Sequence, residues 1–233
     1  MKTVLVLGAY GLIGSACVRA IQSHNVRVIG MGRSEKPAER SGLHIDWIVE
    51  DIANLSVDGW LQHLAGIDVV INAAGALQDG AGDRLNAIHD TAVAKLCEAA
   101  ADSELTIIQI SAAGASETAA TEFFRSKARG DARVQTSGLE WAILRPTLVI
   151  GRNAYGGTAL LRGAAGFPGI GVRLFEDSPV QTIGLSELAD AVAACALGQM
   201  PMGQIYDLTE PDARSFVETI ILVRDWLGFE PYR

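Results

Sequence analysis

Cysteine is scarce in this sequence, which excludes a fold built on disulfides or on a zinc site. The 233 residues include only three cysteines, Cys17, Cys97 and Cys195. They are odd in number and far apart, and each lies in an apolar context typical of a helix. No cysteine or histidine stands at metal-ligand spacing. We therefore expect three reduced thiols in the core of a cytoplasmic protein, and no metal.

Basic residues and long apolar runs are also few. Lysine and arginine number 19 against 27 acidic residues, which gives a formal net charge of −8. This balance, with no cluster of basic residues, argues against a nucleic-acid partner. The longest apolar stretches have the length of strands, so we expect no membrane span within the chain. The sequence starts with a predicted strand and not with a signal peptide.

The first 17 residues combine a strand, three glycines and a helix. Thr3–Leu7 is a continuous apolar run, as expected of a parallel strand buried on both faces. Gly8 permits a tight turn, Gly11 lets a pyrophosphate approach the backbone, and Gly14 lets the helix pack on the strand. The amino end of that helix then faces the phosphates. The combination predicts a dinucleotide-binding site.

Strands and helices alternate along the rest of the chain, which predicts an α/β fold with a doubly wound parallel sheet. Beyond residue 150 the pattern loosens into glycine-rich loops. We expect one domain over residues 1–233, in which residues 151–233 form a small substrate or lid subregion over the carboxyl edge of the sheet. The predicted strands are 3–7, 26–31, 44–49, 68–74, 105–110, 141–144, 181–185 and 205–208. The predicted helices are 12–21, 84–101, 119–135, 186–197 (capped by Ser186) and 214–227.

Several short motifs follow the predicted strands in a set order. They are Gly8-x-x-Gly11-x-x-Gly14, Asp51-Ile52, Asn72-Ala73-Ala74-Gly75, Ser111, Lys127, Leu144-Arg145-Pro146-Thr147 and Gln181-Thr182-Ile183. In this order they resemble the short-chain dehydrogenase/reductase superfamily, in its extended and atypical branches. The nearest likeness is to NmrA-like regulators and to the nucleotide-binding subunit of respiratory complex I. The resemblance implies an NAD(P)-binding Rossmann fold.

The resemblance also implies which residues line the cofactor site. Asp51 and Ile52 would contact the adenine, although Asp51 is nearly as well explained as a turn residue. Tyr10 would cover the pyrophosphate, and Lys127 would hold the nicotinamide ribose. The full set is Gly8, Tyr10, Gly11, Leu12, Ile13, Gly14, Arg33, Ser34, Asp51, Ile52, Ala73, Ala74, Gly75, Ser111, Lys127, Pro146 and Thr147.

The residues after the second strand favour NADP(H) over NAD(H). An NAD site places a carboxylate there to bind the ribose hydroxyls. This sequence has Gly32-Arg33-Ser34 and no acid before Glu35. Arg33 offers a cation and a planar donor fork to a 2′-phosphate, with Ser34 as a second donor. The alternative is that Arg33 is an ordinary solvated residue.

The superfamily's catalytic tyrosine is missing. The resemblance places that tyrosine four residues before Lys127, and the residue there is Phe123, which has no proton to give. Ser111 and Lys127 keep the other two catalytic positions. His89 and Tyr155 are candidate proton donors, although a lone helical histidine is more often structural.

Two functions therefore stay open, and with them whether the chain is an enzyme. One is an NADP-dependent oxidoreductase acting on a small apolar carbonyl or quinone. The other is a non-catalytic NADP(H)-binding protein with a redox-sensing, assembly or regulatory role. The partner is then a small-molecule substrate or another protein. Relatives of this kind extend further, some into a membrane segment, so the chain also fits the soluble part of a longer protein.

Overall fold

A seven-stranded parallel sheet forms the centre of the protein in the computed structural model, which describes residues 1–80, 84–153, 157–167 and 178–232. The strand order is β10-β6-β5-β4-β1-β2-β3. The chain therefore reverses direction across the sheet between β1 and β4, the position where open α/β sheets bind ligands. The bounds are β1 Thr3–Leu7, β2 Arg27–Gly32, β3 Asp46–Val49, β4 Val69–Asn72, β5 Thr106–Ile110, β6 Glu140–Pro146 and β10 Gln204–Leu208.

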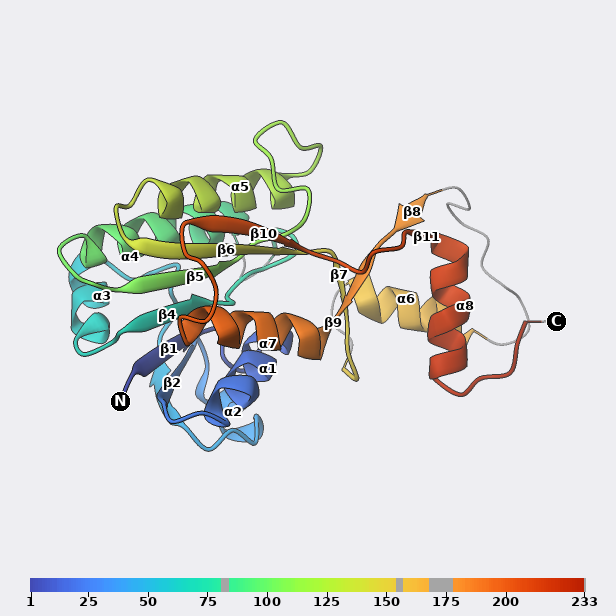
Figure 1. Cartoon of the computed structure of the whole chain (residues 1–233), viewed down its shortest axis with the longest axis horizontal. Coiled ribbons are helices and arrows are strands. Elements are labelled where there is room, and N and C mark those ends of the chain that lie inside the picture. Colours follow the sequence, from blue (N-terminus) through green and yellow to red (C-terminus); the bar gives the residue numbers. More distant parts are fainter. Residues whose placement is uncertain (81–83, 154–156, 168–177, 233) are drawn as a thin grey trace.

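Helices cover both faces of this sheet (Figure 1). α1 and α7 lie on one face, and α3, α4 and α5 lie on the other. β1 contributes to both cores, because Val4 and Val6 pack with the first group while Leu5 and Leu7 pack with the second. The predicted doubly wound fold is confirmed. The helices are α1 Leu12–Gln22, α2 Glu35–Arg40, α3 Val57–Leu64, the π-helix η1 Ala87–Thr91, α4 Ala92–Ala100, α5 Glu122–Gln135 and α7 Leu185–Ala196.

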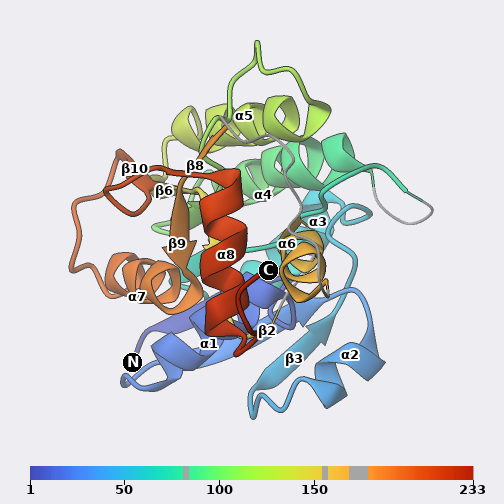
Figure 2. The same cartoon turned by 90° about the vertical axis from the view of Figure 1, so that its right-hand side faces the viewer.

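A small lobe lies beyond the carboxyl end of β6 (Figures 1 and 2). In it β7 pairs with β9 in parallel, and β8 pairs with β11 in antiparallel orientation. Helices α6 and α8 pack through Leu161, Ala165, Ile220 and Val223. Its position fits the expected lid, whose role stays a prediction. The elements are β7 Leu148–Ile150, α6 Gly157–Gly166, β8 Pro179–Val180, β9 Thr182–Gly184, β11 Arg214–Ser215 and α8 Phe216–Trp226.

The ends of two helices differ from the prediction. Ser186 does not cap α7; the N-cap is Gly184, whose N–H donates to the Glu187 carboxylate at 2.9 Å. Residues 214 and 215 form a strand and not the first turn of α8. That helix begins after Ser215, whose hydroxyl accepts from the Glu218 N–H at 3.2 Å. In both cases an acidic residue three positions after the cap fixes the start of the helix.

The π-helix brings η1 unusually close to α5. A Cβ placed on Gly130 of α5 would lie 2.0 Å from the carbonyl oxygen of His89. No side chain fits in that space, so the two backbones pack directly on one another. This contact positions the part of α5 that holds Lys127.

Gly130→Ala should lower the free energy of unfolding by about 1–3 kcal/mol, because backbone atoms must move to admit the methyl group. Gly163 in α6 is the control, since a Cβ there meets nothing within 4 Å. Gly163→Ala should raise stability by about 0.5–1 kcal/mol. Urea unfolding of both variants measures the difference. Equal stabilities would contradict the close contact.

Candidate functional site

The loop after β1 needs two of its glycines for internal packing. Gly8 has a positive φ of 69°, and a Cβ on it would lie 2.9 Å from the Cα of Ala74. A Cβ on Gly14 would lie 2.2 Å from the carbonyl oxygen of Gly8. The β1 end, the start of α1 and the loop after β4 therefore touch through backbone atoms. Close packing and the approach of a cofactor ribose would both favour small side chains at Ala73 and Ala74, so their contact with the cofactor stays a prediction.

Gly11 is different, because the protein itself nearly tolerates a side chain there. Its φ and ψ of −68° and 173° suit any residue, and the nearest atom to an added Cβ is the Gly8 oxygen at 3.1 Å. Gly11 is also the N-cap of α1 and has no side chain to cap it. The N–H groups of Leu12 and Ile13 therefore stand at an open, positive helix end. This arrangement fits a pyrophosphate.

Tyr10 lies beside β2 and β3. Its ring stacks on Trp47 with centroids 6.1 Å apart, and a Cβ on Gly32 would lie 2.3 Å from its Cε1 atom. Tyr10 thus forms a wall next to the predicted ribose-phosphate end of the site, and its contact with the pyrophosphate stays a prediction. Arg33 follows directly and is exposed, and Ser34 is the N-cap of α2.

Asp51 and Ile52 follow β3 and have structural partners. The Asp51 carboxylate accepts from the Ala53 N–H at 3.0 Å and from the Asn54 amide at 3.1 Å, which is a turn. Ile52 packs in the core beside Met31. The turn interpretation of Asp51 therefore has direct support. A contact of these residues with adenine stays a prediction.

Two buried amides that the sequence reasoning left without a role join the ends of β4 and β5. The Asn72 amide donates to Gln109 Oε1 at 2.8 Å, and its own oxygen accepts from the Ala74 N–H at 3.3 Å. These bonds hold the turn that contacts Gly8. The signal in the sequence was two amide side chains within otherwise apolar strands.

His89, Phe123 and Lys127 converge beneath Gly75. A Cβ on Gly75 would lie 3.1 Å from His89 Nε2 and 3.5 Å from Lys127 Nζ. The ring of Phe123 meets His89 edge-on, with centroids 5.8 Å apart. Phe123 is half-buried and lies outside the core clusters. The predicted tyrosine position is thus next to the predicted lysine.

His89 is held in one neutral form. Its Nε2 accepts from the Ala76 N–H at 3.2 Å, so the proton is on Nδ1, which donates to Ser126 Oγ at 2.9 Å. Ser126 in turn donates to the Phe123 carbonyl at 3.0 Å. Burial, with help from the charges of Lys127 and Arg129, lowers the pKa of His89 to about 2. His89 therefore acts as a structural residue, and Tyr155, the other candidate donor, is outside the described residues.

Lys127 is a buried ammonium group. Its Nζ donates to the carbonyl oxygen of Ile110 at 2.8 Å. Burial lowers its pKa to about 8, while the nearby Asp131 carboxylate raises it. Among the described residues, Ile110 is its one hydrogen-bond partner, which leaves two of the three ammonium N–H groups for a ligand near Gly75. A charged group that is this deeply buried is rare unless it has a functional role.

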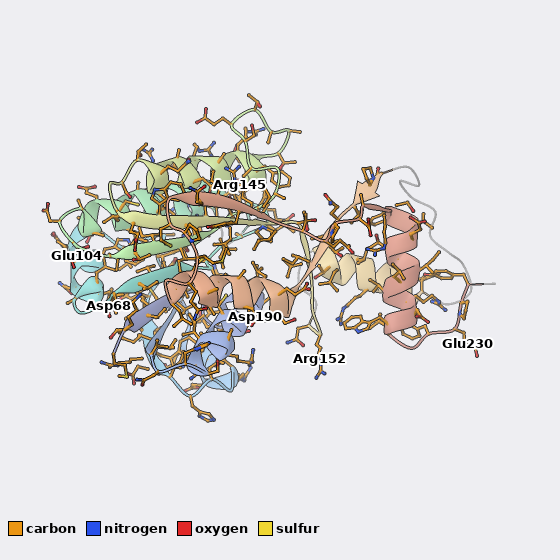
Figure 3. The ribbon with its side chains drawn as sticks, viewed as in Figure 1. Asp68, Glu104, Arg145, Arg152, Asp190 and Glu230 are labelled. Atoms are coloured by element: carbon orange, nitrogen blue, oxygen red, sulfur yellow. The ribbon has the colours of Figure 1, made fainter. Side chains whose placement is uncertain are left out.

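The hydroxyl group of Ser111 donates a hydrogen bond to a carboxylate of the protein. Ser111 Oγ is 2.8 Å from Asp131 Oδ2, which also accepts from Arg145 at 2.8 and 3.1 Å. Arg145 lies on the side of the sheet that α5 covers (Figure 3). Asp131 was missed by the sequence reasoning, although its place four residues after Lys127 puts both on one face of the helix. Ser111 can donate a hydrogen bond to a substrate only by breaking this bond.

Pro146 and Thr147 face the edge of the sheet. Pro146 is buried, and its carbonyl accepts from the Ala113 N–H at 2.9 Å. The hydroxyl of Thr147 lies 3.3 Å from the Leu208 oxygen, in the direction of β10. Their contact with the cofactor stays a prediction.

Among the described residues, no group of three or more His, Cys, Asp or Glu residues is placed to hold a metal, and no helix is long and apolar enough to cross a membrane. Cys17, Cys97 and Cys195 are free and buried. Burial raises the pKa of the Cys17 thiol to about 12, so it is unreactive.

Comparison with known proteins decides the family. Residues 8–169 match the family described as NAD(P)H-binding. The chain belongs to this family. The match covers the glycine loop, Lys127 and the strands between them, and it confirms the Rossmann-type superfamily predicted from the motifs.

Individual relatives of this NAD(P)H-binding protein are distant. An epimerase family protein of Staphylococcus haemolyticus is 32% identical over 77 residues, which span 33% of this chain and only 23% of that protein. UDP-N-acetylglucosamine 4-epimerase from Bacillus cereus has a TM-score of 0.75 at 18% identity, over 98% of this chain and 82% of its own. The Bordetella bronchiseptica enzyme WbmH in complex with NAD⁺ has a TM-score of 0.79 at 17% identity, over 100% and 84%. At these identities the structures share the fold.

Gly11→Val tests the placement of the pyrophosphate. The valine side chain would occupy the open helix end, so NAD(P)H binding should be lost while the fold is retained. Fluorescence titration with NADPH and circular dichroism on the same sample measure both. Gly14→Ala is the contrasting variant, because its methyl group would collide with Gly8 and should lower the melting temperature. A Gly11→Val protein that binds normally would place the site elsewhere.

Proposed function

We propose that this protein binds NADP(H) in preference to NAD(H) and transfers hydride between it and a small apolar carbonyl or quinone. The observation that supports this best is the single edge formed by the open end of α1, the exposed Arg33 and the buried Lys127. These groups suit a pyrophosphate, a 2′-phosphate and a ribose in turn. When bound, the cofactor supplies the hydride, and the residues of this chain bind and orient it.

The preference for NADP(H) rests on Arg33 and Ser34. Arg33 is exposed at the end of β2, next to the wall formed by Tyr10 and Trp47. Ser34 is half-buried, with a backbone that already starts α2. A guanidinium and a hydroxyl can both donate to a 2′-phosphate, whereas neither replaces the carboxylate that an NAD site uses.

Arg33→Ala should reduce the affinity for NADPH by roughly tenfold or more, since a hydrogen bond to a charged group contributes about 1.5–3 kcal/mol. The affinity for NADH should change little. Lys36→Ala is the matched control, because Lys36 is an exposed cation in the first turn of α2. Titration of both cofactors with the three proteins measures the effect. Equal affinities for NADPH and NADH in the unmodified protein would exclude the preference.

We expect an apolar substrate because the side chain next to Lys127, at the predicted nicotinamide end, is the aromatic ring of Phe123, which packs on Phe124. Phe123 and Phe124 are both half-buried and meet edge-on, with centroids 5.2 Å apart. Neither can form a hydrogen bond with a sugar hydroxyl. The proton for a carbonyl would then come from water or from the substrate.

A non-catalytic role is the second candidate, and the protonation of the site favours it. Phe123 has no acidic proton to give. The N–H of His89 donates a hydrogen bond to Ser126, and the hydroxyl of Ser111 donates one to Asp131. Cofactor binding would then change a surface that a partner protein reads. Absorbance of bound NADPH against a panel of carbonyls and quinones separates the two roles.

Phe123→Tyr should create or raise carbonyl reductase activity. The new phenol would stand one helical turn from Lys127 and beside the exposed loop at Gly75, and general acid catalysis of this kind contributes about 10²–10⁴-fold. Phe124→Tyr is the matched control, because its ring packs beside Gly114 and should give no gain. NADPH oxidation is measured with small ketones, aldehydes and quinones. No gain with any substrate, together with a lower melting temperature, would argue against this alignment.

A further inference from the structure

A cluster of three charges, two of them buried, lies next to the predicted nicotinamide end of the site. Lys127 and Asp131 come from one face of α5, and Arg145 comes from β6. Lys127 is 6% exposed and Asp131 is 1% exposed. Two cations therefore share one carboxylate in a region of low dielectric, where each charge depends strongly on the others.

The cluster forms hydrogen bonds with two consecutive residues at the end of β5. The ammonium group of Lys127 donates to the carbonyl of Ile110, and the carboxylate of Asp131 accepts from the hydroxyl of Ser111. The two contacts are 2.8 Å each. Arg145 fixes the carboxylate from the other side through two N–H groups. Lys127 and Asp131 therefore have set positions relative to β5 and to each other.

Only one oxygen of Asp131 takes part in these bonds. Oδ2 accepts all three, whereas Oδ1 is buried and has no hydrogen-bond partner among the described residues. A buried carboxylate oxygen without a partner is costly, because it has given up its water. The remaining attraction available to it is the electrostatic one, toward the nearby ammonium group. The position of Asp131 is therefore better explained by its electrostatic interaction with Lys127 than by its hydrogen bonds alone.

We propose that Asp131 is a positioning residue for the cofactor site, which keeps Lys127 charged and aimed at the nicotinamide ribose. This inference rests on the proposed binding of NADP(H). Beyond that binding, the inference states that the affinity for the cofactor depends on the Asp131 carboxylate, which does not itself contact the cofactor. The other titratable or charged groups around Lys127 are the neutral His89 and the cation Arg145, with Arg129 further out.

The charge of Lys127 sets the expected pH dependence. Its pKa is about 8, so the ammonium form is complete well below that pH and is lost as the pH rises through it. The affinity for NADPH should therefore fall about fivefold with a midpoint near pH 8, since a charged donor binds more tightly than a neutral one. Asp131 raises the pKa of Lys127. Asp131→Asn should thus move the midpoint lower by roughly one pH unit.

The experiment is a fluorescence titration of NADPH between about pH 6.5 and 9.5 with the full chain. Lys127→Met should bind more weakly and without this pH dependence. Asp90→Asn is the matched control, because Asp90 is another buried carboxylate that pairs with arginine, at 2.8 Å from Arg133. It should keep the midpoint of the unmodified protein.

Each outcome has one meaning. An unmodified protein that binds no NADPH at any pH would overturn the proposed function. Normal binding with no pH dependence, or an Asp131→Asn protein with an unchanged midpoint, would overturn the role of Asp131 alone. If Asp131→Asn does not fold, Asp131→Ser replaces it, because it also removes the carboxylate charge. Its midpoint should again lie below that of the unmodified protein, and an unchanged or higher midpoint would count against the proposal.

Discussion

The structure depends on the contact of three backbones at the end of β1. Gly8 turns the chain with a positive φ, Gly14 rests on the carbonyl of Gly8, and Ala74 lies against the other side. Because this contact leaves no space for side chains, it fixes the angle between β1 and α1 and the distance to the loop after β4. This contact helps to position the open end of α1, the side chain of Tyr10 and the turn at Gly75 relative to one another.

The chemistry of the site comes from a second constraint, which is the treatment of buried polar groups. Asn72 and Gln109 satisfy each other, His89 is satisfied by Ala76 and Ser126, and the charges near α5 share one carboxylate. Buried polar groups are tolerated in a protein interior when each has a hydrogen-bond or charge partner. At the predicted nicotinamide end the buried charges are therefore compensated, and the protons of His89 and Ser111 are held in hydrogen bonds within the protein. This combination suits tight cofactor binding more readily than acid–base catalysis.

The sequence predicted the parts of the structure that follow from local patterns. The first strand agrees to the residue, because Thr3–Leu7 is apolar on both faces and ends at a glycine. Helices α2 and α3 were missed. In Glu35–Arg40 only Ala38 is buried and Pro37 interrupts the pattern, so that segment shows no apolar periodicity, and α3 has only eight residues. The partner of Ser111 could not be read from the sequence either, because Asp131 is 20 residues away and only the packing of α5 on β5 joins them. The predicted cofactor contacts of the site residues have yet to be tested.

The wide turn of the π-helix has a consequence for sequence variation. It pushes the carbonyl of His89 into the space where residue 130 would carry a side chain. A change at one of these two features therefore strains the other. A homologue with alanine or a larger residue at position 130 must move the two backbones apart, and one that keeps them in contact favours glycine. Covariation between these two sites, far apart in the chain, would trace how this helix pair diverged.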